Sequence, residues 1–470
     1  MSPSLDTLLS SPQAPTRRSL VACVLTLSLP AILSQLSTTL MQYIDAAMVG
    51  SLGAHATASI GLVEPVIWLF SGWATCAAAG FGVLVAQHVG ASDTDRAQSV
   101  MCQAIVSCLA FGAVLALIGF CVSGHVSAWL GGSGELATDS GDYVRVCALG
   151  FLPLTMVHLG TQMLQCSGEV RTASIINVVS CVLDVLLNSF LIHAGPGLQV
   201  FGLDLAVPGL GLGVKGAALG TMLAETVTAV VLIYVSCRKS EVLRLSHPMA
   251  WMPQRQTIAS ALKVSAPMFL ERTIMSCAYV AMARIVAPLG TTAIAANSLA
   301  ITIEAVCYMP GMGVAVASTT LTGQAIGARR PELAKRFAFA SLFTGMALLA
   351  ASGAIMFVFA PQLMEMMTPD RQVIVLGSQI LRIEAFCEPL FGASIVGAGA
   401  LRGVADTLVP SLIVLVCMWC VRIGAASLVV ASYGLVGVWV AMASELCLRG
   451  ILFIVRMVGL DWEGREAIAS

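Results

Sequence analysis

The stretch "SLGAHATASIGL", residues 51–62, recurs 237 positions later in the chain as "PLGTTAIAANSL", residues 288–299. Five positions are identical in the two copies. In the first copy they are Leu52, Gly53, Ala56, Ala58 and Leu62. The same shift pairs "AQHVGASDTDRA" (86–97) with "GQAIGARRPELA" (323–334) without a gap. The chain is therefore predicted to consist of two similar halves.

The composition places both halves in a membrane. Of the 470 residues, 58% are hydrophobic and 10% are charged, whereas a soluble domain has about 25% charged residues. Helices of about 20 apolar residues span a bilayer, and about twelve such segments occur. We expect an all-α polytopic membrane protein with helices over 20–48, 55–85, 96–123, 138–162, 170–194, 212–236, 258–286, 293–321, 332–359, 372–399, 407–431 and 435–458.

Six helices in each half give both halves the same direction of entry into the membrane, so an axis along the membrane normal relates them. That arrangement is typical of transporters. The expected division is a tail at 1–19, an N-lobe at 20–236, a linker at 237–257, a C-lobe at 258–458 and a tail at 459–470.

Lys and Arg residues indicate the orientation. They gather in the connections that follow even-numbered helices, while "GSLGAHA" and "SYGLVG", which follow odd-numbered helices, hold none. By the positive-inside rule, both termini and the linker are predicted to be cytoplasmic in a multi-pass protein of the cytoplasmic membrane.

A few carboxyl groups inside the predicted helices are candidates for function, because a charge there costs about 2.5–3.5 kcal/mol and usually faces a bundle interior or a wet cavity. Asp45 aligns with Met282 in the repeat, and Asp184 aligns with Trp419. These acids therefore belong to the first half alone, which suggests an asymmetric ion site.

The spacing of polar side chains supports such a site. Asp184 and Asn188 are four residues apart and lie on one helix face. Asp45 shares its face with Thr38, Met41 and Gln42. Carboxyl, amide and hydroxyl groups from separate helices make either a proton-sharing pair of carboxyl groups or an oxygen cage for Na⁺. The alternative is that Asp45 and Asp184 only hold the helices together through hydrogen bonds.

The remaining buried charges are expected to be mainly structural. Glu225 and Glu445 end the similar stretches "GVKGAALGTMLAE" and "GLVGVWVAMASE", so a shared structural role is predicted for them. The arginines of the second half are expected to pair with its glutamates. For Glu271, beside Arg272, contact with a transported compound and simple ion pairing are both open.

Several function classes are excluded or unsupported. No G-x-x-x-x-G-K-[ST] sequence is present to bind a nucleotide, and neither H-E-x-x-H nor G-x-S-x-G is present for hydrolysis. We expect a transporter rather than an enzyme, without a cofactor and without nucleic acid as a partner. The 15 cysteines are scattered through apolar segments, where they act as small hydrophobic side chains.

Taken together, "LPAILSQLSTTLMQYIDAAMVGSLG", "VAQHVGASDTDRA", "TGQAIGARRPELA", "GALRGVADTLVP" and "GVKGAALGTMLAE" resemble the multidrug and toxic compound extrusion (MATE) family from about residue 20 to 458. The resemblance implies two six-helix lobes, and we expect the protein to be a monomer. It implies antiport driven by H⁺ or Na⁺ and export of organic cations or other amphipathic compounds. A flippase for a lipid-linked precursor, found in the same superfamily, is the alternative.

The resemblance also assigns roles to single residues. Asp45, fifteen positions after Pro30, matches the family's first-helix Asp, which is tied to ion coupling. Many members carry Asn and then Asp in the fifth helix, whereas Asp184 precedes Asn188 here. Thr221 matches a sixth-helix Thr near that site, and Glu271 looks like the seventh-helix Glu of some members. The expected cation site is thus Asp45, Asp184, Asn188 and Thr221, and the expected substrate pathway is Thr38, Met41, Gln42 and Glu271.

Overall fold

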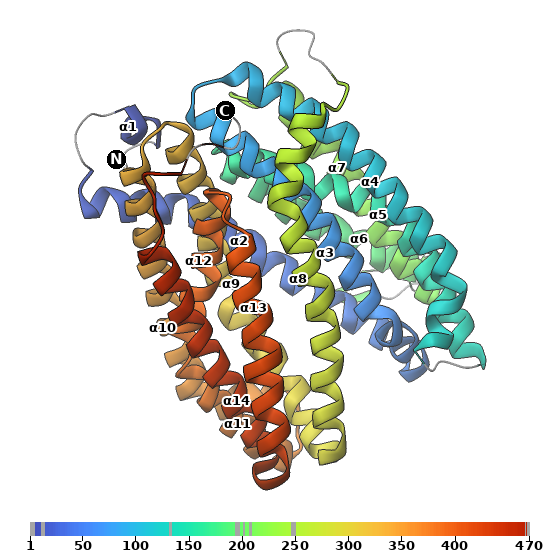
Figure 1. Ribbon diagram of the computed structural model, residues 1–470. Helices are drawn as coiled ribbons and strands as arrows, with labels where there is room; N and C mark the ends of the chain where they lie inside the picture. The colour runs from blue at the N-terminus through green and yellow to red at the C-terminus, as the bar shows by residue number, and fades with distance from the viewer. Residues whose placement is uncertain are drawn as a thin grey trace. The chain divides into compact units, whose positions relative to one another are not determined.

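The computed structural model describes residues 5–10, 15–130, 134–192, 198–200, 203–205, 209–245, 251–465 and 467. Parts of the predicted tails and of the predicted linker 237–257 lie outside these residues. The first half of the chain forms α1 (Leu5–Ser10), α2 (Arg17–Gly50), α3 (Ala54–Gly90), α4 (Thr94–Trp129), α5 (Gly134–Cys166), α6 (Val170–Ile192) and α7 (Gly213–Arg238) (Figure 1). The second half forms α8 (Arg255–Val286), η1 (Ala287–Leu289), α9 (Thr291–Gly327), α10 (Pro331–Met367), α11 (Arg371–Ala385), α12 (Glu388–Gly403), α13 (Leu408–Val416), η2 (Cys417–Ile423) and α14 (Gly424–Val458).

The prediction of an all-helical protein with twelve membrane helices is confirmed. Among the described residues, nine helical stretches are long and apolar enough to cross a membrane, and one of them, Leu408–Val458, is long enough for two crossings. Its helix is interrupted at Gly434, where φ is 56° and ψ is −141°, between the predicted helices 407–431 and 435–458. The predicted spans 258–286 and 372–399, which are richer in charge, are helical as α8 and as the pair α11 and α12.

One predicted helix, 372–399, is broken in two. α11 ends at Ala385 and α12 begins at Glu388, with Pro389 in its first turn. Proline lacks the N–H that would continue the preceding helix, but it fits the first turn of a new one. The break places Glu384 just before the interruption and Glu388 just after it.

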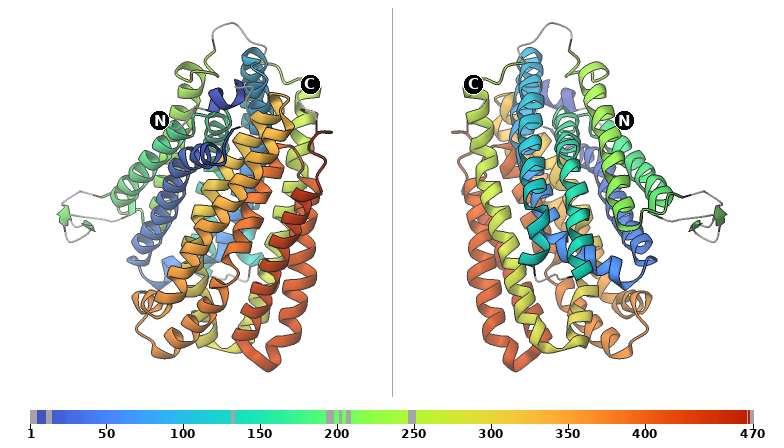
Figure 2. Two further views of the ribbon diagram at one scale, coloured as in Figure 1. Left: turned by 90° about the vertical axis from the view of Figure 1, so that its left-hand side faces the viewer. Right: turned by 90° about the vertical axis from the view of Figure 1, so that its right-hand side faces the viewer.

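Two small elements were not predicted. One is α1, and the other is a hairpin between α6 and α7 formed by β1 (Leu198–Val200) and β2 (Leu203–Leu205), which pair antiparallel with Val200 opposite Leu203. Figure 2 shows this hairpin beyond the ends of the two helices. Strands of three residues are too short to give a periodic signal in the sequence.

The chain divides into two compact units. Unit 1 holds Met1–Gln35, Ala86–Ser92 and Val264–Ser470, and unit 2 holds Leu36–Val85 and Asp93–Lys263. Helix α2 is therefore divided between the units after Gln35, and the last turns of α3 belong to unit 1. These units do not test the predicted N-lobe at 20–236 and C-lobe at 258–458, which stay a prediction.

The repeated Gln-x-x-Gly sequence forms a close crossing of α3 and α9 within unit 1. A Cβ atom at Gly90 would lie 1.9 Å from the carbonyl oxygen of Gln324, and one at Gly327 would lie 1.9 Å from that of Gln87. The two contacts are exchanged by the shift of 237 that relates the halves. Only glycine permits such backbone approach, so this part of the repeat is structural in both copies.

The hydrophobic clusters that position the candidate site lie in unit 2. Met48, Val49 and Ala56 pack with Ile192 and Ala217, which joins the ends of α2 and α6 to the starts of α3 and α7. Burial of such side chains is the largest favourable contribution to packing in the parts of the protein away from lipid. This cluster fixes α2 against α6 one helical turn beyond Asp45.

Candidate ion-binding site

Helices α2 and α6 meet along a seam in unit 2. The Cys181 thiol donates to Thr38 Oγ1 across 4.0 Å, and Asn188 Nδ2 donates to Asp45 Oδ1 across 3.0 Å. Each pair is separated by 143 residues, so seven residues along α2 correspond to seven along α6. The two helices therefore run in the same direction, and Thr38 and Asp45 face the same partner.

The polar centre of the seam joins two carboxyl groups through one amide. Asn188 Nδ2 donates to Asp45 Oδ1 and to Asp184 Oδ2, each at 3.0 Å. Asp184 and Asn188 are 2% and 1% exposed, and Asp45 is half-buried. The sequence prediction that these three side chains come together thus agrees with the geometry of unit 2.

Two oxygen atoms of this centre lack a donor. Asp184 Oδ1 and Asn188 Oδ1 are buried, and neither accepts a hydrogen bond from any described residue. Buried polar atoms in proteins nearly always have a partner. Since both are acceptors beside two acidic groups, a proton on a carboxyl group or a bound cation such as Na⁺ fits the donor set.

A third helix, α7, completes the site through close packing on α6. A Cβ atom at Gly216 would lie 2.4 Å from the Leu191 carbonyl oxygen, and one at Gly220 would lie 2.0 Å from Asn188 Oδ1. Small residues at this four-residue spacing let membrane helices approach closely. The next residue, Thr221, interacts with the Asp184 carboxyl group. The "GVKGAALG" sequence signals this packing, although it does not say which helix is the partner.

The predicted substrate-pathway residues are divided between the two units. Thr38 lies in the α2–α6 seam, Met41 is half-buried and Gln42 is exposed, all in unit 2. Glu271 belongs to unit 1, where its Oε2 atom accepts a hydrogen bond of 2.6 Å from Ser411 Oγ on α13. Glu271 had two interpretations, contact with a transported compound and ion pairing with Arg272. Within the described residues, no ion pair joins Glu271 and Arg272.

The buried charges of unit 1 form a different network. Arg422 Nη2 lies 2.8 Å from Glu445 Oε2 and Arg449 Nε lies 3.3 Å from Glu445 Oε1. Arg449 also lies over the Phe391 ring, 5.4 Å from its centroid. Arg422 belongs to the π-helical segment η2, a local widening that is frequent at specialised sites. The expected pairing of arginines with glutamates is thus found for Glu445.

The other glutamates of unit 1 are not in ion pairs within the described residues. Glu384 accepts from the Cys387 thiol at 3.1 Å, and both carboxyl oxygens of Glu388 are buried without a hydrogen bond to a described residue. Glu384 and Glu388 are both 0% exposed. Arg382 instead donates to the Phe357 carbonyl group and stacks on its ring.

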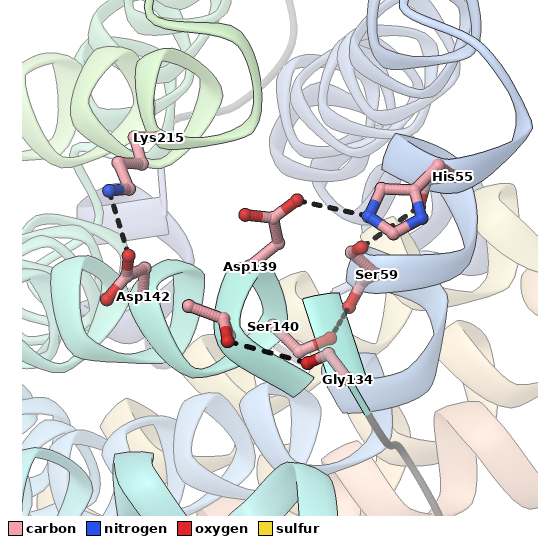
Figure 3. Close-up of polar contacts among 8 residues, drawn as sticks. His55, Ser59, Gly134, Asp139, Ser140, Asp142 and Lys215 are labelled. Atoms are coloured by element: carbon pink, nitrogen blue, oxygen red, sulfur yellow. Dashed lines mark hydrogen bonds and ion pairs between the residues drawn. The ribbon is translucent and has the colours of Figure 1, made fainter. Parts of the chain in front are cut away.

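Ion pairs also join the helix starts at one end of unit 2. Figure 3 shows Asp139 directed at His55 and Asp142 directed at Lys215. The distances are 3.2 Å from His55 Nε2 to Asp139 Oδ2 and 2.8 Å from Lys215 Nζ to Asp142 Oδ2. Beneath them, the buried Ser140 hydroxyl donates to the Ser59 carbonyl oxygen. These contacts join α3, α5 and α7 at the end where α7 begins.

Residues 30–190 and 267–428 each match the MatE family. The two segments begin 237 positions apart, which is the shift of the internal repeat. The chain is 25% identical to the probable multidrug resistance protein NorM of Thermotoga maritima, over 94% of this chain and 93% of that protein. It is 24% identical to the multidrug resistance protein PmpM of Pseudomonas aeruginosa, over 87% and 85% of the two chains.

Solved structures are similar across nearly the whole chain. An outward-facing multidrug resistance MATE family transporter of the MOP superfamily has a TM-score of 0.85 and 22% identity, and the match covers 93% of this chain and 96% of that one. A crystal structure of MATE in complex with MaD3S has a TM-score of 0.86 and 21% identity over 97% and 98% of the chains. At these identities the likeness concerns the fold.

Proposed function

The chain belongs to the MatE family of membrane transporters, which are not enzymes, and we propose that it is a multidrug efflux antiporter driven by H⁺ or Na⁺. Its cargo would be organic cations or other amphipathic compounds. The relatives named for multidrug resistance support this cargo class. The protein would act as a monomer of two six-helix lobes in the cytoplasmic membrane, with both termini in the cytoplasm, as the distribution of Lys and Arg favours.

The observation that carries the proposal is the bridging of Asp45 and Asp184 by the single amide of Asn188. Two carboxyl groups that share one donor repel each other when both are ionised. No arginine or lysine pairs with either of them among the described residues. A monovalent cation, either a proton or Na⁺, would neutralise this charge, and its arrival and departure would change the state of the site.

Coupling would follow from competition. An ion shifts a conformational equilibrium only by binding one state more tightly than the other. Uptake of the ion at Asp45, Asp184, Asn188 and Thr221 would remove negative charge from unit 2, which would weaken the binding of a cationic cargo along α2. Release of the ion on the other side would restore that charge and the affinity for cargo.

The central test replaces Asp45, the half-buried acid of the site, which an ion can therefore reach. Asp45→Asn keeps the size of the side chain and removes the charge, so gradient-driven efflux is expected to be lost while the protein stays folded. Purified protein in liposomes would be given a fluorescent organic cation, with a pH gradient and an Na⁺ gradient applied separately. The two gradients distinguish the coupling ion.

The matched control is Asp139→Asn, which makes the same chemical change in the same unit at an exposed ion pair. It is expected to transport at the wild-type rate. Efflux by Asp45→Asn at the wild-type rate would refute the proposed site. Failure of wild-type protein to move the cation under either gradient, together with movement of a lipid-linked precursor, would instead favour a flippase.

A further inference from the structure

The glutamates at the ends of the two similar stretches have different surroundings. Glu445 in unit 1 contacts two arginines, at 2.8 Å and 3.3 Å. Within the part of the chain that the structure describes, Glu225 in unit 2 has no ion pair and no hydrogen bond to its carboxyl group. The shared structural role predicted for the two residues is therefore not supported by their contacts.

A difference of one residue in register explains why the surroundings differ. Gly213 and Gly434 both have φ of 56° and open the last helix of their halves. Glu225 follows its glycine by twelve residues and Glu445 by eleven. One residue turns an α-helix by about 100°, so the two carboxyl groups leave their helices in different directions.

No cation lies near Glu225 along its own helix. Arg449 stands four residues after Glu445, whereas Ala229 stands four residues after Glu225. The basic residues of α7 are Lys215 and Arg238, about 15 Å and about 20 Å from Glu225 at the rise of an α-helix. Lys215 is already paired with Asp142.

The neighbours of Glu225 connect it to the candidate ion-binding site. Thr221 lies one helical turn earlier on the same face of α7 and interacts with the Asp184 carboxyl group. Glu225 itself interacts electrostatically with Asp184 on α6 and with Cys147 on α5. A Cβ atom at Gly150 on α5 would lie 3.7 Å from Glu225 Oε2. The half-buried Glu225 carboxyl group thus lies against α5, and its electrostatic interaction with Asp184 links it to the candidate site.

We propose that Glu225 is a further proton-binding residue of this site, so that unit 2 takes up one cation at Asp45, Asp184 and Asn188 and a proton at Glu225. The inference rests on the proposed function. Three acids, Asp45, Asp184 and Glu225, share one unit with no basic side chain paired to them among the described residues, so their mutual repulsion favours neutralisation of more than one.

A proton fits the surroundings of Glu225 better than a metal cation. Its α5 neighbours, Cys147 and Gly150, offer no side-chain oxygen, and the carbonyl groups of membrane helices are engaged within the helix. A metal cation such as Na⁺ needs several oxygen ligands, whereas a proton needs only the carboxylate itself. The ligand assigned to Glu225 is therefore H⁺.

The test measures how many protons drive one cargo molecule. In liposomes with the membrane potential held at zero and a pH difference of one unit, each proton exchanged multiplies the limiting cargo gradient about tenfold. If the cation at Asp45, Asp184 and Asn188 is a proton, wild-type protein is expected to reach about 100-fold and Glu225→Gln about tenfold. If that cation is Na⁺, the pH gradient alone is expected to give about tenfold for wild-type protein and no accumulation for Glu225→Gln. Glu225→Asp keeps a carboxyl group and is the matched control, expected at the wild-type limit.

The outcomes separate this inference from the proposed function. A limit for Glu225→Gln equal to that of wild-type protein would overturn the role of Glu225 and leave an antiporter in place. Absence of any gradient-driven transport by wild-type protein would refute the function itself.

A second measurement requires no variant. A hydrophobic carbodiimide attaches to protonated carboxyl groups in apolar surroundings, and mass spectrometry locates the adduct. Modification of Glu225 in wild-type protein is expected to fall as pH rises, while Glu445, paired with two arginines, stays unmodified. No adduct at Glu225 at any pH would contradict the inference, even if Glu225→Gln failed to fold.

Discussion

The two units of this transporter carry buried carboxyl groups in opposite settings. In unit 1, Glu445 is held by Arg422 and Arg449, and Glu384 and Glu388, which have no ion pair among the described residues, are entirely buried. In unit 2, Asp45 and Glu225 are half-buried, and no basic side chain among the described residues pairs with them. A carboxyl group fixed by arginines is suited to holding helices together, whereas an accessible and unpaired one is suited to exchanging a cation.

The repeat makes this difference informative. Both halves keep the glycines that bring helices together, such as Gly90 and Gly327, so the packing was duplicated. The ionisable partners were not duplicated, since Asp45 aligns with Met282. Features found in both halves are therefore best explained by folding, and features found in one half are the better candidates for transport.

The largest effect on stability is expected from Glu445→Gln. This change leaves the guanidinium groups of Arg422 and Arg449 buried without their carboxylate, which typically costs about 3–5 kcal/mol. Thermal unfolding of the purified protein in detergent measures the loss. The same change in unit 2, Glu225→Gln, is expected to alter the unfolding free energy by no more than about 1 kcal/mol. Equal losses for both variants would remove the distinction between the two settings.

A smaller effect is expected from Gly220→Ala, which changes the packing of α7 against Asn188 in the candidate site of unit 2. The added methyl group would meet Asn188 Oδ1 at 2.0 Å, so α6 and α7 must separate or the Asn188 amide must turn. Overpacking of this kind costs about 1–3 kcal/mol. The affinity for the coupling ion, measured from the ion concentration that gives half-maximal efflux, is expected to fall about tenfold or more.

Gly124→Ala is the control for that experiment, because a Cβ atom at Gly124 has no neighbour within 4 Å. Alanine is a better helix former than glycine, so this variant is expected to be at least as stable as the wild type and to keep its ion affinity. If both alanine variants lower the ion affinity alike, close packing at Asn188 is not what shapes the site.

The smallest effect is expected from Asp139→Asn, which breaks the pair with His55 shown in Figure 3. The two side chains are 43% and 52% exposed, and exposed ion pairs contribute about 0–1 kcal/mol. Thermal unfolding at low and high salt should show a difference from wild-type protein within that range. A loss as large as that of Glu445→Gln would mean that pairing alone, rather than burial, decides what a charge contributes.

Much of the fold could be predicted from the sequence because membrane helices are recognised by the length of their apolar segments. The meeting of Asp45 with Asp184 and Asn188 was also predictable, since acids in apolar helices turn inward and a spacing of four residues selects a face. The helix break at Pro389 follows a known preference of proline. Hydropathy alone nevertheless predicts one continuous helix over 372–399.

Contacts that depend on register between helices could not be predicted. "GVKGAALG" indicates a close helix crossing, but the partner, Asn188 on α6, appears only in three dimensions. Aligning Glu225 with Glu445 by residue type hid the one-residue difference in their distance from Gly213 and Gly434. The bond between Glu271 and Ser411 joins residues 140 positions apart, and no local pattern signals it.

The division of α2 between the units has a structural consequence. The residues before Leu36 belong to unit 1, whereas Asp45 is anchored to Asn188 in unit 2. A Cβ atom at Gly313 of unit 1 would lie 2.4 Å from the Ile32 side chain, so the first half of α2 packs closely against α9. Helix α2 (Arg17–Gly50) is therefore one continuous helix with a close contact in each unit, at Ile32 in unit 1 and at Asp45 in unit 2. Pro30, which leaves one backbone hydrogen bond unmade, precedes Ile32, so this interruption of the hydrogen-bond pattern lies within the part of α2 that belongs to unit 1.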